Sequence, residues 1–160
     1  MVMIGVDPHK GSHTAVALDE SETELARVRV RASADQREQL LSWASSFEPR
    51  VWAIESAGGL GYLLAQQLVA VGEHVVDVPA TLSARARVLD SGKSDKNDPN
   101  DARAAGIAAL RAPRLPVVQP ADHTEVLRLL AKRNVEIGRT RNKACCRLHS
   151  LNRPGLLGGS

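Results

Sequence analysis

Apolar and polar residues alternate along the first part of the chain in a pattern typical of β-strands. One short apolar run is followed by two runs with period-two character, over residues 3–7, 13–18 and 24–31. Polar segments suited to hairpin turns, 10–12 and 19–22, separate them. The pattern predicts three consecutive antiparallel strands.

The middle of the chain alternates between helical and extended patterns. Apolar residues at helical spacing predict helices over residues 33–46 and 62–71, and short apolar runs predict strands over 51–55 and 74–78. An antiparallel group followed by strands that helices connect makes a mixed sheet, so the predicted fold class is α/β. This order of elements is similar to the RNase H and RuvC-like architecture.

Both predicted helices carry detailed expectations. Ser33 or Asp35 is expected to cap the first helix. The second is expected to turn four apolar side chains inward, those of Leu63, Leu64, Leu68 and Val71.

Residues 82–96 contain basic residues and a Ser-Gly pair, which predicts a basic connection able to hold nucleic acid near a functional site. Its candidate nucleic-acid contacts are Arg85, Arg87 and Lys93, to which Lys10 in the first turn is added. A helix is expected to follow, with Asp98 as its N-cap and Pro99 at its first position.

The last helical pattern runs from Asp122 to about Leu151 and has apolar residues at intervals of seven. It predicts a coiled-coil helix that forms a homodimer or a higher assembly. The opposite side is basic and is a candidate DNA-binding face, with Arg128, Lys132, Arg139, Lys143 and Arg147. The alternative is an amphipathic helix that docks on its own domain.

Charge divides the chain at the same place. Residues 1–120 hold 13 Lys and Arg against 15 Asp and Glu, a net charge of −2, whereas residues 121–160 hold 8 against 3, a net charge of +5. An acidic body followed by a basic helix is typical of a metal-binding domain with a nucleic-acid-contacting extension. No apolar run is long enough to cross a bilayer, and Cys145 and Cys146 are adjacent, so a cytoplasmic protein is expected.

Acidic residues lie where the predicted elements end or begin. Asp7 ends the first strand, Glu55 ends the fourth, and Asp98 and Asp101 open the helix after the basic connection. Carboxylates at the ends of adjacent strands hold hard divalent cations against phosphate oxygens. We therefore expect Asp7, Glu55, Asp98 and Asp101 to bind two Mg²⁺ or Mn²⁺ ions, with Asp95 as the alternative third ligand. Asp98 and Asp101 could instead only cap their helix.

Three motifs in order carry a family resemblance: Ile4-Gly5-Val6-Asp7-Pro8-His9-Lys10, then Ala53-Ile54-Glu55-Ser56, then Lys93-Ser94-Asp95 leading to Asp98-Pro99-Asn100-Asp101-Ala102-Arg103. They resemble the N-terminal domain of the DEDD transposases of insertion-sequence family 110. The resemblance implies a RuvC-like domain over residues 1–120, whose acidic residues use Mg²⁺ to cut or rejoin DNA during transposition. A coiled-coil helix over 121–152 and a disordered tail over 153–160 complete the expected organisation.

The resemblance also implies a longer protein, because family members carry a second domain with a nucleophilic serine after the coiled coil. A truncated copy, not fully active alone, is therefore expected. The alternative is a catalytically inactive fragment that binds DNA or dimerises. A guide RNA, which some relatives use, is a further candidate partner. A sugar-kinase-like phosphate binder is a weaker idea, since it needs a second phosphate-binding hairpin.

Overall fold

The computed structural model describes residues 1–91, 98–112 and 114–151, and the chain divides into two compact units, Met1–Pro120 and Ala121–Ser160. The first unit contains five strands and four described helices. In chain order they are β1 (Val2–Pro8), β2 (Ser12–Leu18), β3 (Glu24–Arg31), α1 (Gln36–Ala44), β4 (Arg50–Glu55), α2 (Tyr62–Val69), β5 (Val75–Val78), α3 (Ala80–Ser91) and α4 (Asp98–Arg111).

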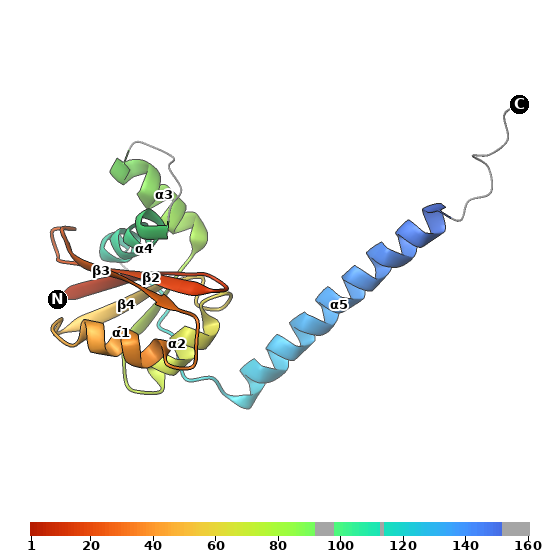
Figure 1. The fold of residues 1–160 in the computed structure, drawn as a ribbon, viewed down its shortest axis with the longest axis horizontal. Helices are drawn as coiled ribbons and strands as arrows, with labels where there is room; N and C mark the ends of the chain where they lie inside the picture. The colour runs from red at the N-terminus through yellow and green to blue at the C-terminus, as the bar shows by residue number, and fades with distance from the viewer. Residues whose placement is uncertain (92–97, 113, 152–160) are drawn as a thin grey trace, which may run out of the picture. The chain divides into compact units, whose positions relative to one another are not determined.

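The strands form one mixed sheet in the order β3-β2-β1-β4-β5 (Figure 1). β1, β2 and β3 pair antiparallel, whereas β4 pairs parallel with both β1 and β5. The predicted α/β mixed sheet with flanking helices is confirmed. Because β1 and β4 are parallel neighbours, their carboxyl ends meet at the same edge of the sheet.

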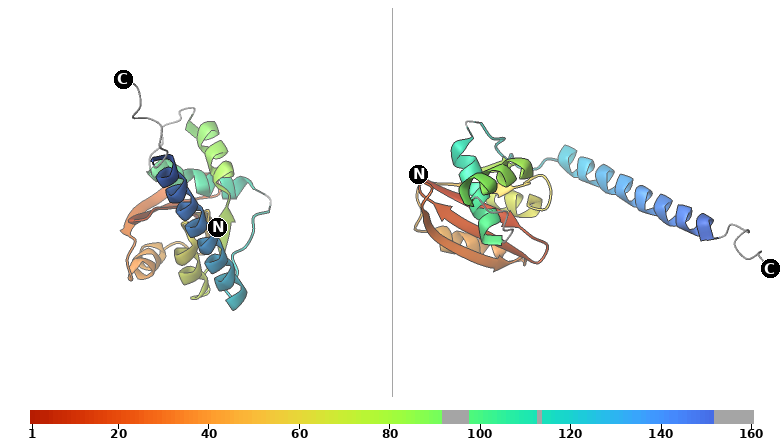
Figure 2. Two further views of the ribbon diagram at one scale, coloured as in Figure 1. Left: turned by 90° about the vertical axis from the view of Figure 1, so that its right-hand side faces the viewer. Right: turned by 90° about the horizontal axis from the view of Figure 1, so that it is seen from above.

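The helices cover both faces of this sheet, α1 and α2 on one side and α3 and α4 on the other (Figures 1 and 2). The α1/α2 side is packed with large side chains, including Trp52, Leu40 and Leu64. The α3/α4 side is packed mainly with small ones, including Ala102, Ala104 and Ala108. Small residues let a helix backbone come closer to the strands than large ones do.

The closest approach lies between Gly5 in β1 and Gly106 in α4. A Cβ atom added to Gly5 would overlap the Ala102 carbonyl oxygen and lie 2.5 Å from the Gly106 backbone nitrogen. Neither backbone atom can turn away as a side chain would. Glycine at position 5 therefore lets α4 lie directly on β1, with Asp101 just before the contact.

One predicted segment is wrong: residues 82–91 of the expected basic connection belong to helix α3. Ser83 and Ala86 are buried on one side of this helix, and Leu82 packs with the α3/α4 core. These three residues recur at helical spacing, which indicates a helix. The prediction of a basic connection rested instead on the four arginine and lysine residues of the segment.

Two details of the helix predictions are also corrected. Leu63 and Val71 do not face inward, since their side chains are 64% and 47% exposed, and α2 buries Leu64, Ala65 and Leu68. Asp35 lies at the N-cap position of α1 without a capping hydrogen bond from its side chain. Its carboxylate instead accepts a bond from the Gln39 side chain at 2.7 Å.

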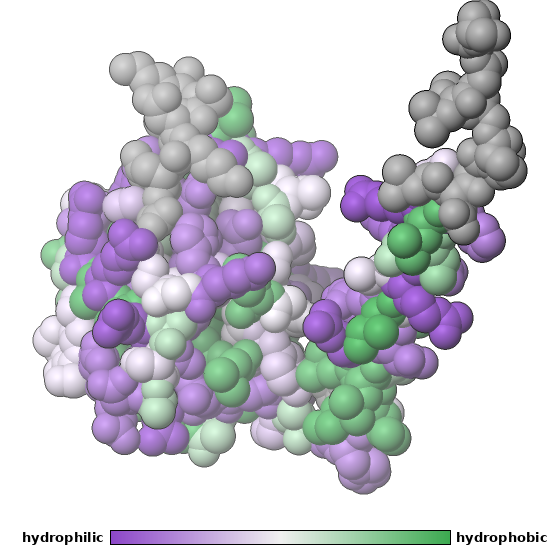
Figure 3. Space-filling view, turned by 45° about the vertical axis from the view of Figure 1, so that its right-hand side comes forward, coloured by the Kyte–Doolittle hydropathy of each residue, from purple (hydrophilic) through white to green (hydrophobic). Residues whose placement is uncertain are grey.

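The second unit contains helix α5 (His123–Leu151), and the predicted long C-terminal helix is thus confirmed. Apolar side chains recur on its surface (Figure 3), with Leu127 63%, Leu130 61% and Leu148 66% exposed. A coiled coil needs a second helix against this surface, so the coiled coil remains a prediction. Within the described residues, no helix has both the length and the apolar character that crossing a bilayer requires.

Candidate functional site

Two predicted site residues lie at the shared carboxyl edge of β1 and β4. The strands pair in the register Gly5 with Ala53 and Val6 with Ile54, so the next step sets Asp7 opposite Glu55. Val6 and Ile54 belong to the α1/α2 core. Because side chains alternate between faces, Asp7 and Glu55 point to the α3/α4 face, the side on which Asp101 lies.

The chain turns sharply after Glu55. Ser56 adopts a left-handed backbone conformation with a φ of 52°. Three hydrogen bonds hold the turn: the Ser56 nitrogen donates to the Val78 oxygen at 2.9 Å, the Gly59 nitrogen to the Ser56 oxygen at 2.8 Å, and the Ala57 nitrogen to Asp77 Oδ1 at 2.7 Å. The strand thus ends at Glu55, which leaves this carboxylate at the open edge.

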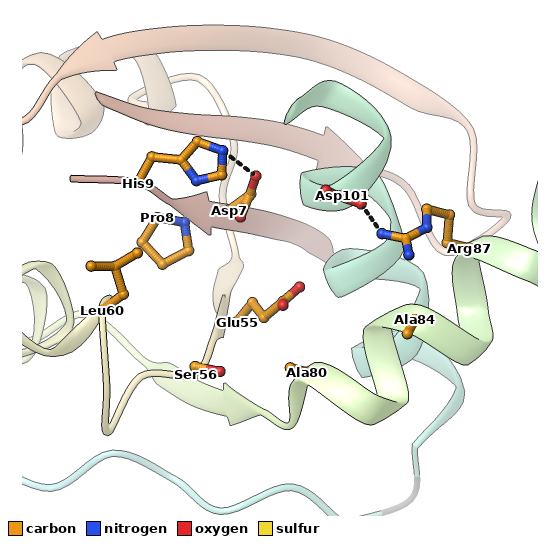
Figure 4. A pocket seen from close by; sticks show the side chains of 10 residues that line it. All are labelled: Asp7, Pro8, His9, Glu55, Ser56, Leu60, Ala80, Ala84, Arg87 and Asp101. Carbon is orange, nitrogen blue, oxygen red and sulfur yellow. Dashed lines mark hydrogen bonds and ion pairs between the residues drawn. The ribbon is translucent and has the colours of Figure 1, made fainter. Parts of the chain in front are cut away.

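A cavity of about 350 Å³ lies at this edge (Figure 4). We call it the carboxylate pocket. Its described lining consists of Asp7, Pro8, His9, Glu55, Ser56, Leu60, Ala80, Ala84, Arg87 and Asp101. Strand ends, the first turns of α3 and the start of α4 thus supply side chains to one site, although these segments lie far apart in the sequence.

The buried acidic residues in the pocket have basic neighbours. Asp7 and Asp101 are 7% and 6% exposed. His9 Nε2 lies 3.6 Å from Asp7 Oδ2, and Arg87 forms an ion pair with Asp101 through Nη1 and Oδ1. Burying a carboxylate is costly unless a positive charge or hydrogen-bond donors accompany it, and Arg87 meets that need for Asp101.

The structure brings some predicted site residues together and leaves others apart. Asp7, Glu55, Arg87 and Asp101 line one pocket, and Asp98 is the first residue of α4. Arg85 is exposed on α3 and does not line the pocket. Lys10 lines a neighbouring cavity. Lys93 and Asp95 lie outside the described residues.

The basic residues of α5 belong to the second unit. Arg128, Lys132, Arg139, Lys143 and Arg147 are all exposed on this helix. Their role as a DNA-binding face stays a prediction.

Sequence reasoning missed two features of the pocket. The lining by Ser56 and Leu60 depends on the left-handed turn, and nothing in the sequence marks Ser56 for that conformation except the glycine-rich segment after it. The pairing of Arg87 with Asp101 joins two helices, and the helical spacing of Leu82, Ser83 and Ala86 was the signal that could have revealed α3.

The oxygen donors fit a hard divalent cation, because carboxylates are the ligands that Mg²⁺ and Mn²⁺ prefer. Within the described residues, no three acidic, histidine or cysteine side chains come together as a ready ligand group. The ion pair with Arg87 accounts for part of this, since it engages the Asp101 carboxylate. The donor chemistry therefore fits, with Asp101 Oδ1 engaged by Arg87.

Comparison with known proteins gives a consistent result at the level of sequence. The model of the family DEDD_Tnp_IS110, described as Transposase, matches residues 4–152. A Streptomyces clavuligerus protein, the insertion element IS116 uncharacterized 44.8 kDa protein, is 32% identical over 150 residues. That match covers 94% of this chain and 38% of the relative, so the chain spans well under half of the relative's length.

Solved structures are similar at the level of fold. The Thermus thermophilus RuvC structure has a TM-score of 0.55 at 16% identity and covers 74% of this chain and 100% of RuvC. The T. thermophilus RuvC in complex with a Holliday junction substrate has a TM-score of 0.56 at 15% identity, with coverage of 74% and 99%. The expected RuvC-like fold and the resemblance stated from the motifs are both confirmed.

Proposed function

The chain belongs to the DEDD_Tnp_IS110 family of transposases, and we propose that its first unit is a metal-dependent centre that cuts and rejoins DNA strands during transposition. The observation that carries this proposal is that Asp7, Glu55 and Asp101 all line one pocket. Three separate segments supply these carboxylates, and Asp7 and Asp101 are buried although they are acidic. Helix capping explains Asp101 alone.

In this proposal Asp7, Glu55 and Asp101 hold the cation, with Asp98 as the fourth acidic residue. When bound, Mg²⁺ or Mn²⁺ activates the attacking oxygen and stabilises the leaving oxygen of a phosphodiester. Asp7 is fixed by β1 and Glu55 by β4, so the strand register sets their separation. Asp101 becomes available when Arg87 releases it, and the freed guanidinium is then placed to bind a DNA phosphate.

DNA as the partner rests on chemistry and on the RuvC likeness. The T. thermophilus RuvC of the second matched structure holds a Holliday junction substrate. In this chain, Arg87 and His9 line the pocket beside the carboxylates, and Lys10 is exposed next to His9. Basic groups at the mouth of an acidic metal site suit a polyanion that must reach the metal.

The test is DNA cleavage with Mg²⁺ or Mn²⁺, using supercoiled and branched DNA and the full chain. Asp7→Asn and Glu55→Gln keep the shape of each side chain but remove its charge, and each is expected to reduce cleavage by at least about 100-fold. Glu38→Gln is the matched control, because Glu38 is 75% exposed on α1, away from the pocket. Cleavage that persists in Asp7→Asn would contradict the proposal.

A second candidate function is DNA binding or self-association through α5 without cleavage. The observation that favours it is the exposed apolar series on this helix, which includes Leu130 and Ile137. Homodimer formation would cover these side chains, and the basic residues would remain for DNA. DNA binding and dimerisation that survive in Asp7→Asn, with no cleavage by the unmodified chain, would favour this function. The same binding assay with RNA tests the guide-RNA prediction.

A further inference from the structure

A second cavity of about 450 Å³ adjoins the carboxylate pocket, and we call it the side pocket. The two share His9 and Leu60 in their linings. Figure 4 shows both residues on the side of the carboxylate pocket away from Arg87. The volume lies in the range of about 300 to 1,000 Å³ that small ligands occupy. A molecule bound at the carboxylates could therefore extend into the side pocket without leaving the surface.

Exposed apolar side chains form part of the side pocket. Leu60 is 53% exposed and Leu63 is 64% exposed, and both line it. Single exposed leucines are common, but two that line one cavity beside a candidate catalytic site are a surface on which an apolar face can rest. Exposed leucines are also used by DNA-binding proteins to separate stacked bases. Leu63 was expected to face inward, but it faces outward and so contributes to this surface.

A chain of hydrogen bonds among lining residues of the side pocket fixes the direction of one amide. His13 Nε2 lies 2.9 Å from Gln36 Oε1, and Gln36 Nε2 donates to Gln67 Oε1 at 2.6 Å. Burial lowers the pKa of His13 below its ordinary value, against the opposing effect of the Gln36 hydrogen bond, and thereby favours the neutral ring. A carbonyl oxygen can only accept, so His13 donates from Nε2, and Gln67 keeps its amide nitrogen for the pocket.

The side pocket therefore offers donors to its ligand. The Gln67 amide, the exposed Lys10 ammonium and the His9 ring belong to its lining, and none of the described lining residues is acidic. Donors of this kind match the carbonyl and ring-nitrogen acceptors of a nucleobase, and a lysine matches a phosphate. Apolar side chains beside donors are what an unstacked nucleotide needs, since its base has an apolar face and a polar edge.

We propose that the side pocket binds one unstacked nucleotide of the DNA strand that lies in the carboxylate pocket, with the base against Leu60 and Leu63, its edge on Gln67 and its phosphate near Lys10. This rests on the proposed function, because it assigns a subsite next to the same metal centre. It also names a feature of the DNA that the protein favours: a base that is unpaired beside the cleaved bond. An unpaired base costs less to move out of the stack than a paired one.

The test compares two DNA duplexes that differ by one unpaired nucleotide, with binding measured by fluorescence anisotropy in Ca²⁺ so that cleavage does not interfere. The full chain is expected to bind the duplex with the unpaired nucleotide about tenfold more tightly than the fully paired one. Leu63→Ser and Gln67→Ala are expected to lose most of this preference. Val71→Ser is the matched control, since Val71 is 47% exposed and lines no described pocket.

A 2-aminopurine at the unpaired position reports unstacking directly. Its fluorescence is expected to rise when the unmodified chain or Val71→Ser binds, and to rise much less with Leu63→Ser. Equal binding of both duplexes by the unmodified chain, or an undiminished preference in Leu63→Ser and Gln67→Ala, would overturn the side-pocket proposal and leave the metal centre standing. If the unmodified chain binds neither duplex, both proposals are overturned together.

Discussion

Opposite edges of the same sheet carry an arginine–carboxylate pair, and the two pairs differ in their surroundings. At the amino ends of β4 and β5, Arg50 donates to Glu73 with Nε at 2.9 Å and Nη2 at 2.5 Å, and Trp52 Nε1 donates to the same carboxylate at 2.7 Å. At the carboxyl edge, Arg87 pairs with Asp101 beside two other acidic residues in a cavity.

This difference separates a structural pair from an exchangeable one. The Arg50 guanidinium also donates to the Ala44 carbonyl at 3.0 Å, so it joins α1 to β4, and its second carboxylate partner, Glu48, is exposed. Arg87 lines a pocket that also contains the carboxylates of Asp7 and Glu55, and these attract the Arg87 guanidinium as well. We infer that the first pair holds the fold together, whereas the second balances a buried charge until another cation replaces it.

The largest expected effect comes from breaking the backbone contact that sets the carboxyl edge. Gly5→Val places a branched side chain into the Ala102 and Gly106 backbone, so α4 must move away from β1. The free energy of unfolding is expected to fall by more than about 4 kcal/mol, measured by urea denaturation. Gly11→Ala is the matched control, because a Cβ atom there meets nothing within 4 Å. A stable Gly5→Val protein would show that α4 can shift without cost.

Removing the structural pair is expected to have the next largest effect. Arg50→Ala leaves the Glu73 carboxylate, which is 14% exposed, without its main partner, and frees the end of α1. The free energy of unfolding should fall by about 3 kcal/mol. Added Mg²⁺ should not restore it, because the second carboxylate at this edge, that of Glu48, is 73% exposed and would bind an ion weakly in competition with water. If Mg²⁺ restores the stability of Arg50→Ala, the Arg50–Glu73 pair is as exchangeable as the Arg87–Asp101 pair.

Arg87→Ala is expected to lower stability by about 1 to 2 kcal/mol in the absence of metal, since Asp101 loses a cationic partner. Here Mg²⁺ should restore the lost stability, because the ion takes over the charge balance. Calorimetry should also find tighter Mg²⁺ binding than in the unmodified chain. Weaker binding would mean that Arg87 assembles the site instead of holding Asp101 back.

The smallest expected effect is a dependence on pH at the structural pair. Burial opposes the ionised form of Glu73, but hydrogen bonds from Arg50 and Trp52 outweigh it and hold the pKa of Glu73 below its ordinary value of 4.5. A lowered carboxyl pKa stabilises the fold above the unfolded value, and this stabilisation is lost as the pH falls through the folded value.

The stability difference between the unmodified chain and Glu73→Gln should therefore be constant between pH 7 and 5 and shrink below about pH 4.5. Urea denaturation at pH 7, 5 and 3.5 measures it. A difference that stays the same at pH 3.5 would mean that Glu73 acts through its shape and not its charge.

The strands were predictable from sequence because their cores are apolar and their ends carry turn residues. Asp7 and Glu55 could be placed at one edge for the same reason, since parallel pairing of β1 and β4 requires it. Helix α3 was not predicted, because its buried side is formed by small residues such as Ser83 and Ala86, which give a weak hydrophobic signal.

Asp101 was expected beside Asp7 and Glu55, but the packing that brings it to the strand ends was not predicted. It depends on a contact between Gly5 and Gly106, two residues without side chains, which leave no trace in a hydrophobic pattern. A glycine inside a strand and another inside a helix were the available signals. Each glycine alone indicates only a local weakening of its strand or helix. Their contact with each other becomes visible only in the folded structure.

The Gly5–Gly106 contact joins the first strand of the unit to its last helix, and this has a consequence for a chain that is still being made. Synthesis at about 5 to 20 residues per second separates the two glycines by roughly 5 to 20 s. During that interval β1 and β4 can pair, but α4 has not yet been translated. A nascent chain therefore carries Asp7 and Glu55 before Asp101, and the carboxylate pocket gains the side chain of Asp101 only after α4 has been made.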